Sequence, residues 1–193
     1  MHIVPFLSYV FVTTFTPGPN NIMSMANANK YGFFKTLKFV LGVSAGSFVI
    51  MLLSCYFNLL LFSFIPKIEL VMTILGSAYM LYLAFKIMKS KPNMEHDDEK
   101  KSNTFFSGLI LQFINPKALI YGITVISTFI VPFYKSDLSF ILFSLFLAFV
   151  VFLATSCWAA FGAVFQRFLS RYQTPFNMVM GMLLLYSAIS MFV

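Results

Sequence analysis

The chain alternates between long apolar runs and short polar stretches, and six of the runs are long enough to cross a membrane. A spanning helix needs about 20 mostly apolar residues. The runs have no polar face that a soluble helix would turn to water. The pattern therefore predicts an all-α membrane protein with six transmembrane helices. The expected spans are residues 3–26, 37–64, 66–87, 105–129, 138–161 and 175–193.

The first span contains a polar, helix-breaking centre. Residues 15–23 read FTPGPNNIM, with Pro17, Gly18 and Pro19 in the middle of an otherwise apolar run. Proline removes a backbone donor and clashes with the preceding turn, so the helix should open here. Inside a membrane, opened backbone is tolerated only where it is buried in protein or lines a cavity. This stretch therefore predicts a cavity at mid-membrane.

A second break lies in the fourth span, where Asn115 precedes Pro116 and is pushed away from helical geometry. The polar residues 89–104 divide the chain into two sets of three spans, 1–88 and 105–193. Because three is odd, the second set must enter the membrane upside down. The sequence thus predicts two inverted three-helix repeats whose first helices, spans one and four, are both broken mid-membrane. Matched interruptions of this kind are typical of a transporter site.

Composition and charge narrow the class of protein. Hydrophobic residues make up 60% of the 193 and charged residues only 10%, against about 25% in soluble domains. The net charge of +7 is explained by topology, since no basic stripe on a soluble domain offers a nucleic-acid surface. Cys55 and Cys157 lie within apolar runs without metal-ligand spacing, so they are expected to be packing residues.

The basic residues also predict an orientation. Ten of the 13 lie in or beside the three connections that would share one side of the membrane, and basic loops stay in the cytoplasm. Both termini are therefore expected outside. These ten residues are Lys30, Lys35, Lys38, Lys86, Lys89, Lys91, Lys100, Lys101, Arg167 and Arg171.

Three stretches resemble the LysE/RhtB family of bacterial amino-acid exporters: TPGPNN (16–21), GSAYMLYLAFKIMKS (76–90) and GLILQFINPKALIYG (108–122). The resemblance extends over essentially the whole chain. Within the family it is strongest to exporters of cysteine and O-acetylserine, through ISTFIVP, SCWAAFGAVFQR and LLLYSA. It implies export across the bacterial cytoplasmic membrane. Many family members have Asp at the position of Asn20, so this chain lacks that carboxylate.

The two breaks suggest how a zwitterion would bind. A helix that restarts offers free N–H groups and a partial positive charge, which suit a carboxylate, and a helix that stops offers carbonyls, which suit an ammonium. The second break would repeat the arrangement. The expected binding residues lie at or near the breaks or, for Tyr79, in the third span. They are Thr16, Pro17, Gly18, Pro19, Asn20, Asn21, Tyr79, Gln112, Asn115, Pro116, Lys117 and Tyr121.

Lys117 is the only basic residue expected deep within a span, where an insertion penalty of about 2.5–3.5 kcal/mol applies. In one interpretation it contacts the substrate carboxylate or exchanges a proton. In the other it snorkels to the interface or donates to the carbonyls of the broken helix. The asparagines have the same two interpretations, as substrate contacts or helix caps. Tyr79 either lines the path or packs as aromatic core.

No Asp, Glu or His is expected in a span interior, so an enzyme, a catalytic site, a metal site or a cofactor is not expected. A cationic substrate would lack a counter-ion and would meet Lys117. We therefore predict a secondary transporter that exports small neutral zwitterionic amino acids, such as cysteine or O-acetylserine. The alternatives are another amino-acid class (homoserine or threonine, leucine, basic amino acids) or a metal or ion. Proton coupling through Lys117, a tyrosine or water, and facilitated diffusion, both remain open. A homodimer is compatible with the small size of the chain.

Overall fold

The computed structural model describes residues 2–58, 74, 77–78, 80–85, 87–89, 103–164 and 173–189. Every regular element in these ranges is helical, which confirms the all-α prediction at that level. The elements are α1 (Ile3–Phe15), α2 (Pro19–Tyr31), α3 (Phe33–Tyr56), α6 (Phe105–Ile114), α7 (Pro116–Val125), the π-helix η2 (Ile126–Ile130), α8 (Asp137–Val164) and α10 (Gln173–Ile189).

Both predicted interruptions are present. Helix α1 ends at Phe15, and α2 begins at Pro19, a residue suited to the first helical turn because its missing N–H has no partner there anyway. In the second half, Asn115 is extended (φ −79°, ψ 104°), as expected before a proline. Helix α6 and the continuous α7–η2 segment meet there at a bend of 70°.

The first helix continues further than expected. The sequence predicted its end near residue 26 and a basic loop up to residue 36, but α2 runs to Tyr31 and α3 starts at Phe33. Gly32 alone joins them, with φ at 85°, a conformation that glycine adopts without strain. Lys30 is therefore in the last turn of α2, and Lys35 lies within α3.

Glycines let the helices approach closely. A Cβ on Gly42 of α3 would lie 1.9 Å from the carbonyl oxygen of Phe105 in α6. In the same way, a Cβ on Gly108 of α6 would lie 2.2 Å from the carbonyl oxygen of Phe39 in α3. The small residues of α3 therefore serve packing within this chain. Helices α3 and α8 are also in close contact, since Ser44 Oγ donates to the Ala148 carbonyl (2.9 Å).

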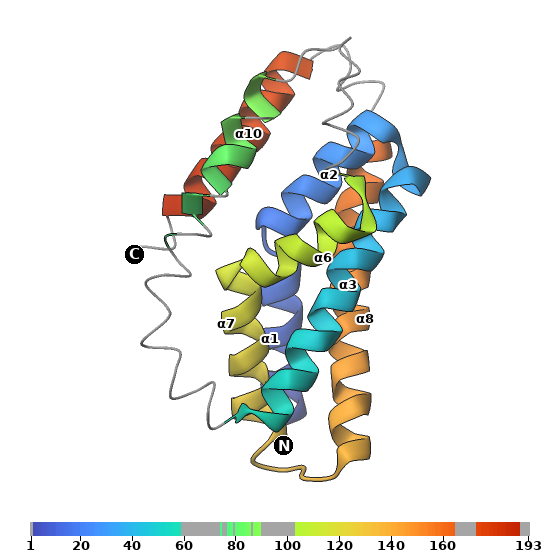
Figure 1. Cartoon of the computed structure of the whole chain (residues 1–193), viewed down its shortest axis with the longest axis vertical. Helices are drawn as coiled ribbons and strands as arrows, with labels where there is room; N and C mark the ends of the chain where they lie inside the picture. The colour runs from blue at the N-terminus through green and yellow to red at the C-terminus, as the bar shows by residue number, and fades with distance from the viewer. Residues whose placement is uncertain are drawn as a thin grey trace.

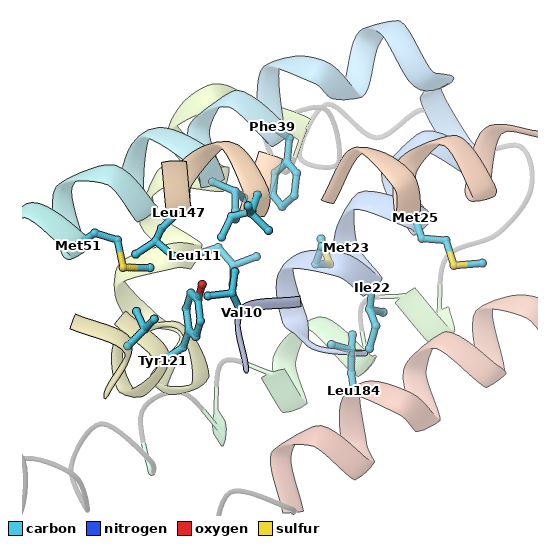
Figure 2. Close-up of a cluster of buried hydrophobic side chains, with 14 of the residues drawn as sticks. Val10, Ile22, Met23, Met25, Phe39, Met51, Leu111, Tyr121, Leu147 and Leu184 are labelled. Atoms are coloured by element: carbon cyan, nitrogen blue, oxygen red, sulfur yellow. The ribbon is translucent and has the colours of Figure 1, made fainter. Parts of the chain in front are cut away.

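Apolar side chains fill the space between these helices. Figure 2 shows Val10 of α1, Met51 and Phe39 of α3, Leu111 of α6 and Leu147 of α8 in one buried cluster. The core therefore draws on both halves of the chain, which interlock instead of forming separate bundles (Figure 1).

The third predicted span lies mostly outside the described residues. Its described residues, 74, 77–78, 80–85 and 87, are helical, as are 88–89 just after it, and this segment lies beside α10. Ser77 Oγ donates to the Ala188 carbonyl (3.1 Å), and a Cβ on Gly181 would lie 2.3 Å from Met88 Cγ. This segment and α10 thus form a close helix pair.

Within the described ranges, α3 and α8 are long and apolar enough to cross a membrane, and the bent α6–η2 segment makes a third candidate if it counts as one span. Helices α1 and α10 are apolar but shorter. The arrangement of six spans in inverted repeats stays a prediction.

Candidate functional site

The two helix breaks meet at a cavity of about 50 Å³. One water needs roughly 10–15 Å³, so the cavity has room for a small polar molecule. Its walls come from α1, α2, α6, α7 and α8 and the breaks between them. The lining residues are Thr13, Thr14, Gly18, Asn20, Asn21, Gln112, Asn115, Lys117, Ala118, Tyr121, Val151 and Thr155.

The ammonium of Lys117 links the breaks directly. Its Nζ donates to Thr16 Oγ1 (2.9 Å), to the Thr16 carbonyl (3.4 Å) and to the Pro17 carbonyl (3.2 Å). Gly18 keeps this approach open, because a Cβ there would lie 3.3 Å from Nζ. Donation to the carbonyls of the broken helix, one of the two interpretations that the sequence allowed for Lys117, is present in the structure. Contact with a substrate carboxylate stays a prediction.

Other side chains close the rest of the α1 end. Asn21 Nδ2 donates to the carbonyls of Thr14 (2.8 Å) and Thr16 (3.0 Å), and Trp158 Nε1 donates to that of Phe15 (3.2 Å). Carbonyls that lose their helical partners need other donors when they are buried. The end of α1 is therefore satisfied by side chains from α2, α7 and α8.

A buried chain of amides crosses three helices beside the cavity. Asn20 Nδ2 of α2 donates to Gln112 Oε1 of α6, and Gln112 Nε2 donates to Ser47 Oγ of α3 (2.8 Å). Gln112 is only 1% exposed. This chain uses the amide nitrogen of Asn20 and so leaves its amide oxygen for another partner.

The two helix starts at the site differ. Asn115 Oδ1 accepts from the Lys117 backbone N–H (3.1 Å), so α7 carries its own cap. No such side-chain bond is found at Gly18, the N-cap of α2, within the described structure. The expectation that the second break would repeat the first is therefore wrong at this point, because Asn115 caps α7.

Two polar atoms in the cavity wall are buried without a hydrogen-bond partner among the described residues: Asn20 Oδ1 and the Tyr121 hydroxyl. Tyr121 is 4% exposed, and Figure 2 shows its hydroxyl directed into the bundle. A buried polar group left unpaired costs about 1–3 kcal/mol. Both atoms are therefore open to hydrogen bonds from whatever fills the cavity.

Most of the residues expected from the sequence meet at this cavity. Seven line it: Gly18, Asn20, Asn21, Gln112, Asn115, Lys117 and Tyr121. Thr16 and Pro17 hold the ammonium of Lys117. Pro19 and Pro116 are buried at the starts of α2 and α7 and are not part of the lining. Tyr79 lies outside the described residues.

The structure adds residues that sequence reasoning missed. Thr13 and Thr14 lie in the turn before the first break, and Val151 and Thr155 come from α8. Thr155 Oγ1 donates to Asn21 Oδ1 (3.5 Å), and its carbonyl accepts from Ser24 Oγ (3.0 Å). Closeness to the break could have indicated the two α1 threonines, whereas nothing in the local sequence connects α8 to the site.

Broken helices around a small polar cavity are typical of a membrane transporter, and comparison with known proteins places the chain in a family of translocators. Residues 11–193 match the family model for LysE type translocators, so the chain belongs to that family. It is 36% identical over 184 residues to the cysteine/O-acetylserine efflux protein of Klebsiella pneumoniae, covering 95% of this chain and 93% of that protein. The protein of the same name from Escherichia coli K12 is 35% identical over 188 residues, covering 97% of this chain and 95% of that one. No solved structure shows significant similarity.

Proposed function

We propose that this protein is a secondary transporter that exports small neutral zwitterionic amino acids or their derivatives, of the cysteine and O-acetylserine type, across the cytoplasmic membrane. The observation that carries the proposal is a cavity at two helix breaks whose wall holds one ammonium, Lys117, and two unpartnered polar atoms. The printed names of the relatives support the choice of substrate.

The charges in the site favour a neutral side chain on the substrate. Among the described residues the only carboxylate is that of Asp137, which accepts from the Tyr56 hydroxyl at 3.0 Å and is not part of the cavity wall. A cationic side chain would meet Lys117 without a counter-ion. The carboxylate that every amino acid carries would gain from Lys117 and from the uncapped start of α2.

The proposed binding residues are those that line the cavity or hold Lys117. Tyr79 stays a candidate from the sequence alone. We place the cavity at mid-membrane, between two inverted repeats (1–88 and 105–193) joined by a cytoplasmic linker (89–104), in a six-span protein with both termini outside. The described helix breaks and the basic residues beside the predicted cytoplasmic connections support this arrangement. A homodimer stays a prediction that native mass spectrometry in detergent can check.

Counterflow into proteoliposomes tests the transport proposal. Vesicles loaded with an unlabelled amino acid should accumulate labelled cysteine, O-acetylserine and serine, and not labelled lysine or arginine. Lys117→Ala and Asn20→Ala should each lower the rate about tenfold or more, since a hydrogen bond to a charged group contributes about 1.5–3 kcal/mol. Lys38→Ala, on the exposed side of α3, is the matched control.

The panel also separates the alternatives. Accumulation of lysine or arginine without cysteine or serine would overturn the proposed substrate class. Accumulation of homoserine, threonine or leucine alone would show that the substrate is one of those amino acids instead. If no amino acid is transported, the proposal of amino-acid transport is wrong, and labelled metal ions should be tested next. Efflux measured with and without an imposed pH gradient decides whether protons are coupled: a gradient-dependent rate supports coupling, and an unchanged rate supports facilitated diffusion.

A further inference from the structure

The ammonium position at the end of α1 is already filled. Helix ends that stop inside a protein present carbonyl oxygens and a partial negative charge, which suit a cation. Here the three acceptors at that end, Thr16 Oγ1 and the carbonyls of Thr16 and Pro17, all receive Lys117 Nζ at 2.9–3.4 Å. A substrate amino group would have to displace this lysine to bind there.

The cavity wall offers the amino group other acceptors. Asn20 Oδ1 is buried with no partner in the described structure, while its Nδ2 is held by Gln112. The Tyr121 hydroxyl is likewise unpaired within the described residues, on a side chain that is 4% exposed. Both groups line the same cavity as Lys117, and both accept hydrogen bonds.

We infer that Lys117 permanently occupies the ammonium cradle of broken helix α1, so that the amino group of the substrate binds Asn20 Oδ1 and the Tyr121 hydroxyl while its carboxylate binds Lys117 and the start of α2. In this arrangement the chain supplies its own cation to the carbonyls. The substrate then needs one carboxylate for the lysine and one ammonium for the two neutral oxygens. The inference rests on the proposed function for the identity of the substrate.

A set of three ligands separates the two ends of the substrate. Cysteine carries both charges, cysteamine lacks the carboxylate, and 3-mercaptopropionate lacks the amino group. Each is measured under reducing conditions as an inhibitor of counterflow of labelled cysteine. Tyr121→Phe should weaken inhibition by cysteine and cysteamine about tenfold and change that by 3-mercaptopropionate less than about twofold. Lys117→Met should weaken cysteine and 3-mercaptopropionate but not cysteamine.

Tyr9→Phe is the control, because Tyr9 stacks on Tyr121 (ring centroids 6.0 Å apart) but does not line the cavity. It should leave all three ligands unchanged. Equal weakening of all three by Tyr121→Phe, or no effect of that substitution on cysteine, would overturn the inference while leaving amino-acid transport intact.

A second measurement does not depend on transport. Lys117→Ala empties the cradle, and n-propylammonium restores the atoms that the substitution removes. Saturating n-propylammonium should raise the Tm of purified Lys117→Ala by about 2–4 °C. It should not raise the Tm of the wild type or of Lys38→Ala, and n-propanol should have no effect. Absence of this stabilisation, or equal stabilisation of the wild type, would show that the carbonyls do not form an ammonium cradle.

Discussion

A lysine in the interior of a membrane helix needs a local reason, and the break in α1 supplies one for Lys117. Three acceptors at that break, Thr16 Oγ1 and the carbonyls of Thr16 and Pro17, surround the ammonium at 2.9–3.4 Å, and a charged donor strengthens such hydrogen bonds. The same contact satisfies two backbone carbonyls that lost their helical partners. The residue that is most costly for the bilayer therefore stabilises the break that the proposed function requires.

Gln112 is the residue whose neutral substitution should disturb the site most selectively. Gln112→Leu leaves Asn20 Nδ2 without its acceptor, and Ser47 keeps its bond to the Val43 carbonyl (2.9 Å). We expect a loss of stability of about 1–3 kcal/mol, the usual effect of one buried unpaired polar group, seen as a lower Tm. The transport rate should fall as well, because Asn20 loses its fixed orientation.

Gln112→Glu, measured at a pH low enough to protonate the new carboxyl, is the matched variant, since that group can accept from Asn20 Nδ2 and donate to Ser47 Oγ as the amide does. It should keep more of the wild-type Tm than Gln112→Leu does. An equal Tm for wild type and Gln112→Leu would show that the amide chain does not hold Asn20 in place.

The amino-acid sequence predicted the break residues of this site because proline and glycine act on the backbone at their own position. Asn20, Asn115 and Lys117 followed from their closeness to those prolines. The residues that hydrogen-bond to them could not be predicted from the sequence. Thr155 lies on α8, and a threonine within a helix usually satisfies its hydroxyl on a carbonyl of its own helix, so nothing local marks it as a neighbour of Asn21.

At the scale of the helices, tertiary packing overrides local polarity. The α2 segment between residues 26 and 31 contains two asparagines and a lysine, which favoured a loop in the sequence analysis. It is helical because it packs against α8: a Cβ on Gly162 would lie 2.2 Å from the Met25 carbonyl, and Asn29 Nδ2 donates to the Gly162 carbonyl (3.5 Å). Polar side chains that face a neighbouring helix do not require water.

The glycine contacts between α3 and α6 make a prediction about stability. Gly108→Ala places a Cβ 2.2 Å from a backbone oxygen, which cannot move aside as a side-chain end can. The helices must separate, and overpacking of this kind costs about 1–3 kcal/mol or more. Thermal unfolding in detergent should show a clear drop in Tm for Gly108→Ala and for Gly42→Ala.

Leu41→Ala is the control next to Gly42 in α3, because the Leu41 side chain is half exposed. Its Tm should stay near that of the wild type. If both glycine variants unfold at the wild-type temperature, the two helices do not cross as closely as the structure has them.

At the scale of the whole molecule, the helix ends gather at two levels. Asn103 Nδ2, just before α6, donates to the Lys35 carbonyl near the start of α3 (3.3 Å). At the opposite level the Tyr56 hydroxyl at the end of α3 donates to Asp137 at the start of α8 (3.0 Å). Figure 1 shows the N-terminus near this second level. Six alternating spans would produce such levels, and the basic residues near Gly32 would then face the cytoplasm.

This orientation can be tested with a matched pair of phenylalanines. Phe34 (83% exposed) lies at the predicted cytoplasmic level and Phe133 (52% exposed) at the opposite one, and replacing either leaves the balance of basic residues unchanged. In a background with Cys55→Ser and Cys157→Ser, a membrane-impermeant maleimide should label Phe133→Cys in intact cells. It should label Phe34→Cys only after permeabilisation. The reverse pattern would place the termini in the cytoplasm and would mean that the basic residues do not set the topology. Labelling of both variants in intact cells would mean that no membrane barrier separates the two levels, which would rule out the six-span arrangement itself.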